Sequence, residues 1–240
     1  MNSETKLKFQ QPALLEPPKF KTALEYRDRF TFGIDKLDSK LQLHLDDMIS
    51  IFGETRYTNV LATRLVVRSL LPRNHGGSNA EKIIVIDADN SSSPYLYVDI
   101  ARQYGMHHRN VLRKVLVSRQ FTIYQLTNTI LYDLPKRIQL HKPKIIVVSG
   151  LLDQFYQDPY IRSAEAESLV SQIVTALHKI KDVFIILTSR LTGNEIIIPA
   201  LSRIEIRAKK EFDETKLNFS IYNNGRLRKV SMTVAELGID

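Results

Sequence analysis

Cysteine is absent from this 240-residue sequence, and long apolar runs are absent as well. Without cysteine the chain cannot form disulfides, cysteine-ligated zinc sites, iron–sulfur clusters or thiol nucleophiles. No apolar stretch approaches the roughly 20 residues that a membrane span needs. The polar segment from Met1 to Gln11 has no signal-peptide core. We therefore expect a cytoplasmic protein with no membrane partner.

The residue patterns of common metal and nucleophile sites are missing too. The six histidines show neither H-x-x-x-H nor H-E-x-x-H spacing, the patterns that hold zinc on a helix. No G-x-S-x-G sequence is present, so a hydrolase-type serine is not indicated. The adjacent His107 and His108 are interpreted as a solvated pair in a loop. We expect no metal and no cofactor.

Positive charge is concentrated in one part of the chain. The net charge is +8, from 34 Lys and Arg against 26 Asp and Glu. A basic excess often indicates a nucleic-acid partner, although it also serves ordinary solubility. The stretch from Ile100 to Leu152 contains one acid, Asp133, and nine basic residues, and so carries the whole excess. These basic residues are Arg102, Arg109, Arg113, Lys114, Arg119, Lys136, Arg137, Lys142 and Lys144.

Apolar strands alternate with amphipathic helices along most of the chain, which predicts an α/β fold with a mostly parallel sheet covered by helices. The tail alternates in a two-residue period around Asn223-Asn224-Gly225, which predicts an antiparallel extension. Residues 1–29 are interpreted as a flexible arm and residues 30–240 as the core domain. The expected strands are Met48–Phe52, Lys82–Asp87, Val115–Ser118, Lys144–Ser149, Val183–Thr188, Ser202–Lys209, Lys216–Tyr222 and Arg228–Thr233. The expected helices are Thr58–Leu71, Pro94–Tyr104, Thr122–Leu140 and Ala164–Ile180.

The first of these strands ends in glycine, where a phosphate-binding loop G-x-x-x-x-G-K-[S/T] would begin. Only the first glycine, Gly53, is present. Thr58 replaces the second glycine, Asn59 the lysine, and Val60 the hydroxyl that holds Mg²⁺. Together these changes remove the phosphate and metal contacts of the motif. Arg56 is the one residue that remains as a substitute phosphate contact.

An ordered series of segments resembles the RecA/RadA recombinase family, and archaeal RadA in particular. The series covers nearly the whole chain, and its order is more specific than any one piece. The matching segments are Gly33–Asp38, Ile51–Glu54, Leu71-Pro72 through Gly76-Gly77 to Ile86–Asn90, Val117–Phe121 and Ala235–Asp240. The resemblance implies a RecA-type fold.

The family's catalytic positions are changed in this sequence. Its catalytic Glu falls at Asp89, its Walker B Asp at Ser149, and its nucleotide-sensing Gln at Arg190. The resemblance therefore implies a RecA-type chain without ATP hydrolysis. A divergent ATPase that uses Arg56 and Asp89 is the alternative. Asp87 and Asp89 face the same side of an extended chain, which leaves a weak cation contact open.

A short segment before the core resembles the family's F-x-x-A docking motif. In that family the Phe and Ala insert into pockets of a neighbouring protomer, and here they are Phe20 and Ala23. Such small buried anchors on a short strand suit docking at a sheet edge. In the alternative, Phe20 packs on its own core. The family's receiving pocket corresponds to Ile84, Ile86, Leu116 and Ser118, where the last two residues alter the lining.

The two DNA-contacting loops of the family are also modified. The first corresponds to Tyr156–Glu167 and keeps Arg162 at the position of the family's loop arginine, while the second shrinks to Thr192–Glu195. A basic, aromatic-containing segment is the proposed replacement, because cations follow phosphates and aromatic rings stack on bases. Its basic residues are Arg102, Arg109, Arg113, Lys114 and Arg119. The competing interpretation places Phe121 and Val117 in the core and the charges against an acidic protein.

These features predict a non-catalytic RadA-like protein that assists homologous recombination and DNA repair. Its expected partners are a RadA-type recombinase and single-stranded DNA, and a second RadA paralogue is a further candidate. Such a protein would be associated with the nucleoid. The alternative outside this class is a RecA-fold scaffold for protein partners without a DNA role.

Overall fold

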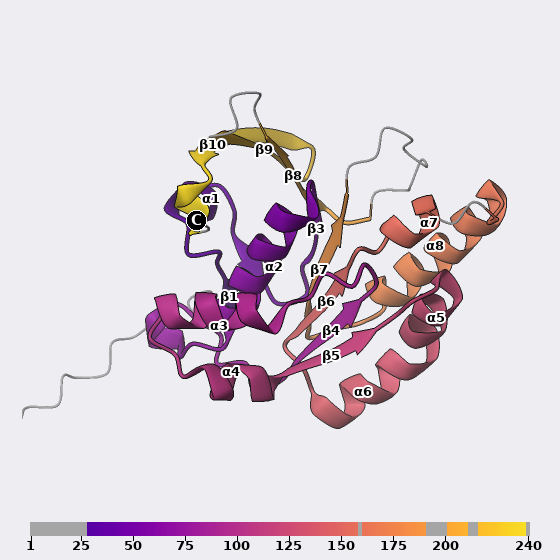
Figure 1. Ribbon diagram of the computed structural model, residues 1–240, viewed down its shortest axis with the longest axis horizontal. Coiled ribbons are helices and arrows are strands. Elements are labelled where there is room, and N and C mark those ends of the chain that lie inside the picture. The colour runs from indigo at the N-terminus through magenta and orange to yellow at the C-terminus, as the bar shows by residue number, and fades with distance from the viewer. Residues whose placement is uncertain (1–27, 158–159, 191–200, 211–215, 239–240) are drawn as a thin grey trace, which may run out of the picture.

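The computed structural model describes residues 28–157, 160–190, 201–210 and 216–238, with the backbone alone at 156–157. An eight-stranded mixed sheet lies at its centre, between helices (Figure 1). The strand order is β10-β9-β8-β3-β7-β6-β4-β5. A two-stranded antiparallel ribbon of β1 (Arg29–Phe30) and β2 (Leu43–His44) lies outside this sheet. The α/β prediction is confirmed.

Six neighbouring strands of the sheet are parallel, and the last two are antiparallel. Strands β3, β4 and β6 have at most one residue that is not buried, and β7 is buried throughout. This explains their continuously apolar sequences, because helices cover both faces of a central parallel sheet. The strands are β3 (Met48–Phe52), β4 (Ile83–Asp87), β5 (Val115–Arg119), β6 (Ile145–Ser149), β7 (Phe184–Ser189), β8 (Ile204–Lys210), β9 (Lys216–Asn223) and β10 (Arg226–Thr233).

Two separate apolar cores form on the two faces of the sheet. On one face α2 (Thr55–Ser69), α3 (Pro94–Gln103) and α4 (His108–Lys114) pack on the central strands, and this core continues beneath β8, β9 and β10. On the other face the core is built by α5 (Ile123–Asn128), α6 (Leu134–His141), α7 (Asp153–Gln157) and α8 (Ser163–His178). The remaining helical segments are α1 (Asp35–Asp38), the 3₁₀ turns η2 (Arg73–His75) and η4 (Ala235–Leu237), and the π turn η3 (Thr129–Asp133). The second set of helices does not extend over β9 and β10.

The structure differs from the predicted helices in two places. Helix α2 starts at Thr55, three residues before the predicted start at Thr58. The single predicted helix over Thr122–Leu140 contains the π turn η3 before α6. Pro135 in the first turn of α6 cannot donate a backbone hydrogen bond, so the regular helical ladder cannot continue through it.

The predicted loop around His107 and His108 was wrong in part, because His108 begins helix α4. This helix is short, and only Val111 of its seven residues is buried. The two imidazole rings stack with their centroids 4.8 Å apart. A single buried position gives too little apolar periodicity to reveal such a helix in the sequence.

The predicted hairpin at the tail is confirmed. Asn223 pairs with Arg226, so Asn224 and Gly225 form a two-residue turn. Both residues have positive φ angles, 49° and 76°. That conformation is typical of an Asn-Gly turn between antiparallel strands. Among the described residues no helix is both long and apolar enough to span a bilayer.

Replacing Gly53 by alanine tests the close approach between the end of β3 and strand β8. A Cβ at Gly53 would lie 2.6 Å from the carbonyl oxygen of Ala208, a backbone atom that cannot rotate away. We expect Gly53→Ala to lower the free energy of unfolding by about 2–3 kcal/mol, as overpacking does. Urea unfolding measures this loss of stability. The control is Gly105→Ala, which has a positive φ but open space around the new Cβ, and which should cost only about 1 kcal/mol. Equal losses in both variants would contradict the steric account.

Candidate functional site

The parallel strands bring the predicted nucleotide-site residues to one edge of the sheet. Gly53 follows β3, Asp89 follows β4, Ser149 ends β6, and Arg190 follows β7. The carboxyl ends of neighbouring parallel strands form the usual ligand-binding edge of such a sheet. The predicted nucleotide-site residues on these strands thus lie at one edge of the sheet.

The segment that corresponds to the phosphate loop is mostly helical. Only Gly53 and Glu54 separate β3 from α2, which begins at Thr55. The backbone N–H groups of Tyr57 and Thr58 both donate to the carbonyl of Glu54, at 2.9 and 3.1 Å. A phosphate loop needs such N–H groups to point at the ligand. Here the helix uses them.

Four predicted site residues lie on α2, where they are buried or have contacts within the protein. Thr58 and Val60 are buried, and the Thr58 hydroxyl donates to the carbonyl of Thr55 at 3.2 Å. The Asn59 side chain donates to the Ser91 carbonyl at 3.2 Å and accepts from the Ser91 hydroxyl at 3.3 Å. These contacts link α2 to the loop after β4. Arg56 lies in the first turn of α2 and also has interactions within the protein.

Asp87 is a fully buried carboxylate at the end of β4. It accepts hydrogen bonds from the backbone N–H groups of Ser91 and Ser92, at 3.0 and 3.3 Å. The Ser149 hydroxyl donates to it at 3.2 Å, and the Arg119 guanidinium forms an ion pair with it at 3.4 Å. Burying a carboxylate is costly unless it is paired and hydrogen-bonded, and these four groups meet that requirement. Ser149, which the resemblance to recombinases places at the Walker B position, thus supports Asp87.

Asp89 lies close to Asp87, in a bend rather than in an extended strand. Burial raises the pKa of its carboxyl group, a hydrogen bond from Ser91 opposes this, and the Asp87 and Asp153 carboxylates raise the pKa further. Gly150 lies against Asp89, because a Cβ on Gly150 would be 2.3 Å from that of Asp89. The tight packing fixes the position of Asp89.

The predicted sensor position, Arg190, is paired with a third aspartate. Asp153, at the start of α7, is buried and accepts from the backbone N–H of Arg190 at 2.9 Å and from its Nε at 3.0 Å. Next to it, the Gln154 amide donates to the carbonyls of Ala88 and Gln120, both at 2.7 Å. These bonds join the ends of β4, β5 and β7 through α7.

Little space remains between α2 and the loop after β4. The cavity lined by Asn59, Ser91 and Ser149 has a volume of about 10 Å³, roughly the minimum for one water molecule. In the part of the chain that the structure describes, no group of three or more histidines and acids is arranged to hold a metal ion. Two guanidinium groups, those of Arg119 and Arg190, provide the positive charge next to the carboxylates.

A second cavity lies beside strand β5, at the edge of the sheet. Its volume is about 300 Å³, and all four residues predicted to form the docking pocket line it: Ile84, Ile86, Leu116 and Ser118. Helix α6 forms the opposite wall with Leu134, Arg137 and His141. Strand β5 has no strand on its outer side among the described residues. The docking residues Phe20 and Ala23 themselves lie outside the described residues.

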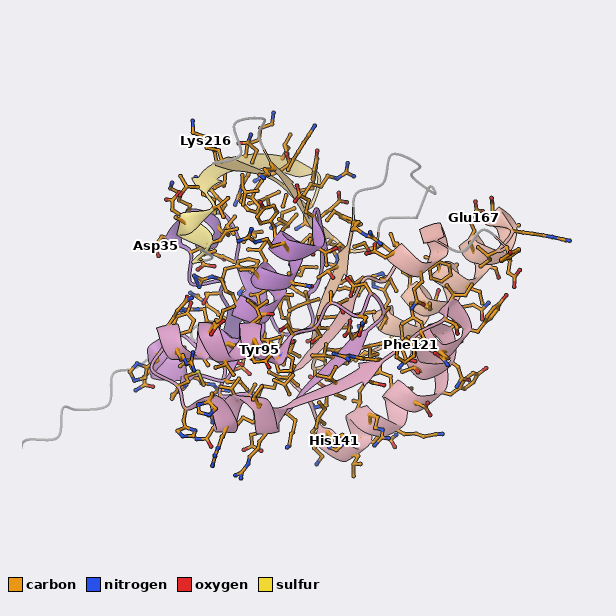
Figure 2. All side chains as sticks on the ribbon, viewed as in Figure 1. Asp35, Tyr95, Phe121, His141, Glu167 and Lys216 are labelled. Carbon is orange, nitrogen blue, oxygen red and sulfur yellow. The ribbon has the colours of Figure 1, made fainter. Side chains whose placement is uncertain are left out.

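Large apolar side chains are exposed on strand β5 and on the segments that follow it, and one of them, Val117, lines the cavity. Phe121 is 72% exposed and Val117 is 49% exposed, so the interpretation that places both in the core was wrong. Tyr124, Tyr132 and Leu140 on the adjoining helices are exposed as well. Clustered apolar exposure of this kind marks protein interfaces. Figure 2 shows the Phe121 side chain in this region, near the end of β5.

The basic residues predicted to contact DNA do not form one surface. Arg109, Arg113 and Lys114 lie on α4, which precedes the amino end of β5, whereas Arg119 lies at its carboxyl end. Arg162 lies just before α8, at the carboxyl edge of the sheet. Arg102 pairs with Asp99 at 3.4 Å, Arg119 pairs with Asp87, and the Lys114 amine donates to the Ala80 carbonyl. Arg109 and Arg113 are exposed, and no ion pair is seen for either within the described residues.

A family model described as Rad51 matches residues 29–198, which is most of the chain. The chain belongs to the Rad51 family. The matched region includes both the filled edge of the sheet and the cavity beside β5. The family's RecA-type fold agrees with the observed mixed sheet and its antiparallel extension.

Several curated relatives are meiotic recombination proteins. The mouse and human proteins named meiotic recombination protein DMC1/LIM15 homolog are each 28% identical over 207 residues, which is 79% of this chain and 59% of theirs. The Arabidopsis thaliana DMC1 homolog is 28% identical over 161 residues, 65% of this chain and 46% of its own. The chain thus spans about half to three-fifths of the length of these Rad51-family relatives.

Several residues that hold the carboxyl edge of the sheet together could not be predicted from the sequence. Asp153, Gln154 and Ser91 drew no prediction, and Arg119 was assigned to DNA. One signal was available, since the run Ser91-Ser92-Ser93 follows a strand that ends in Asp87, and serine N–H and hydroxyl groups commonly satisfy such a carboxylate. The partners of Asp153 and Gln154 come from other strands, which local sequence cannot reveal.

Replacing Asp89 by asparagine tests the electrostatic cost of this carboxylate cluster. Because the pKa of Asp89 is raised in the folded chain, the folded state binds a proton more tightly than the unfolded state. Stability is therefore lost as the pH rises through the folded pKa. We expect Asp89→Asn to be more stable than the wild type at pH 7, with a difference that shrinks towards pH 4. Urea unfolding at several pH values measures this.

The matched control is Asp99→Asn, at an exposed aspartate on α3. It should change the free energy of unfolding by less than about 1 kcal/mol at every pH, as expected for a surface pair. An Asp89→Asn variant that loses stability at pH 7 would contradict the account.

Proposed function

We propose that this chain is a non-catalytic, RadA-like member of the Rad51 family that assists homologous recombination and DNA repair. It docks on a RadA-type recombinase through its N-terminal segment and binds single-stranded DNA, without hydrolysing ATP. The recombination role of the relatives, which are named meiotic recombination proteins, supports the process. The single observation that carries the non-catalytic part is the start of α2 at Thr55.

Two features of α2, its early start and the identity of its side chains, support loss of ATP chemistry. Backbone N–H groups that bond within a helix cannot also bind a triphosphate. The side chains that would neutralise phosphate and hold Mg²⁺ are those of Asn59 and Val60, and neither can do so. Arg119 pairs with Asp87 and Arg190 pairs with Asp153, so two of the three neighbouring carboxylates have a guanidinium partner within the described residues.

The cavity beside β5 supports a docking function. An open strand edge offers backbone hydrogen bonds to an added strand, and an adjoining pocket accepts an anchoring side chain. In this chain the edge and the 300 Å³ cavity adjoin each other. We propose that this edge and cavity receive an anchoring segment of a recombinase partner. The exposed arginines of α4 support the DNA part, because unpaired guanidinium groups are suited to phosphate contacts.

Equilibrium binding of Mg²⁺-ATP tests the non-catalytic proposal. Calorimetry with the full chain should detect no binding at micromolar nucleotide, and a phosphate-release assay should detect no turnover above the buffer rate. Micromolar binding would overturn the proposal. If Arg56→Ala abolished such binding, the divergent ATPase would be the correct description.

Capture by an immobilised RadA-type recombinase tests the docking proposal. Phe20→Ala combined with Ala23→Ser should weaken capture by roughly 30-fold or more, the loss expected for a buried aromatic anchor. The matched control is Lys21→Ala, which changes a charge within the same segment and should leave capture nearly unchanged. Capture that is insensitive to the double substitution would reject the proposal.

A further inference from the structure

The outer face of the antiparallel extension is a charged surface that the proposed function leaves unused. Leu217, Phe219 and Ile221 of β9 point into the core beneath the sheet. The alternate residues of β9 therefore point outward, and directly opposed residues of β8 and β10 share that face. The second helix layer does not reach it. Figure 2 shows Lys216 at the outer end of this extension.

The strand register defines the rows of this face. Ser220 pairs with Arg207 of β8 and with Lys229 of β10, and Asn218 pairs with Lys209 and Ser231. A third row contains Glu205, Tyr222 and Leu227, and Lys216 lies opposite Thr233. The face thus carries four basic residues, one acid, the Tyr222 ring, Leu227 and small polar side chains.

Tyr222 is exposed in this face and is supported by its neighbours. The Arg207 guanidinium lies 5.6 Å from the centre of the Tyr222 ring, and Arg207 also forms an ion pair with Glu205. Leu227 lies directly opposite Tyr222 in the register and is exposed too. The Arg207 guanidinium therefore partly fixes the ring, of which 38% is exposed. A fixed, exposed ring loses little side-chain entropy when a planar group stacks on it.

We propose that this face binds single-stranded DNA, with a base stacked on Tyr222 and the phosphates held by Lys209, Lys216 and Lys229. We call it the C-terminal platform. The proposal rests on the DNA-binding part of the proposed function and adds a second, separate contact surface to it. Aromatic rings between cations on a sheet surface suit unpaired bases, which a duplex does not offer.

The composition of the platform argues against a protein partner. The cores of protein interfaces are depleted in lysine and rich in large apolar side chains. Here three exposed lysines surround Asn218, Ser220 and Ser231. The net charge of this part of the sequence does not reveal the lysines, because the nearby acids Glu211, Asp213 and Glu214 balance their charge. Those three residues lie outside the described part of the chain.

Fluorescence anisotropy with a labelled oligothymidine and the full chain tests the platform. The triple variant Lys209→Gln, Lys216→Gln and Lys229→Gln should lower the slope of log K against log salt by about 2, since each phosphate contact in a single strand contributes roughly 0.7. Tyr222→Ala should weaken binding about 10-fold. On an abasic strand of the same length, Tyr222→Ala should have no effect. Unchanged thermal unfolding shows that each variant is folded.

Matched variants and the α4 charge reversal separate the outcomes. Lys179→Gln with Lys181→Gln, and Tyr95→Ala on α3, are controls that should leave binding unchanged. Arg109→Glu with Arg113→Glu tests the α4 surface independently. If the wild type does not bind the oligonucleotide, both the DNA part of the proposed function and the platform are wrong. If binding falls only in the α4 variant, the platform alone is wrong. If binding falls in the platform variants as predicted, the platform is supported whatever the α4 result.

Discussion

The buried carboxylate of Asp87 is the constraint on which the carboxyl edge of the sheet depends. It ends a central strand and has no solvent exposure, so its charge must be satisfied by the protein. The loop after β4 bends to present the N–H groups of Ser91 and Ser92, Ser149 supplies a hydroxyl, and Arg119 reaches back from β5. In a similar pair, the Arg190 guanidinium after β7 donates to the buried Asp153 carboxylate on α7. The carboxyl edge is thus held together by the chain's own hydrogen bonds and ion pairs.

The sheet and most helices could be predicted from the sequence because each has its own local signal. Apolar runs such as Ile83–Asp87 identify buried strands, and Asn224-Gly225 identifies the hairpin without any tertiary information. Helix α4 could not be predicted in this way, because only Val111 is buried in it. The sequence shows that the second glycine and the lysine of a phosphate loop are missing after Gly53. It did not show that α2 would begin three residues early, at Thr55.

The three-dimensional arrangement of the charged residues could not be predicted from their order in the sequence. The basic segment from Arg102 to Arg119 is continuous in sequence, yet strand β5 separates its members, and Arg119 is used internally. Conversely, Lys209, Lys216 and Lys229 look unremarkable in a neutral tail, and the antiparallel register gathers them on one face. In both cases the three-dimensional charge pattern is created by pairing between strands. The cavity beside β5 was better predicted, because Ile84, Ile86, Leu116 and Ser118 belong to two neighbouring strands in direct register.

We propose that, in the free protein, helix α2 already forms the hydrogen bonds that a phosphate loop would leave open for a nucleotide. Amide hydrogen exchange at Tyr57, Thr58, Asn59 and Val60 measures this directly. The account predicts that these amides are protected in the free protein, because the N–H groups of Tyr57 and Thr58 already bond to Glu54 and those of Asn59 and Val60 lie within α2. It also predicts the same protection when Mg²⁺-ATP is added. Rapid exchange in the free protein that slows on addition of Mg²⁺-ATP would contradict it.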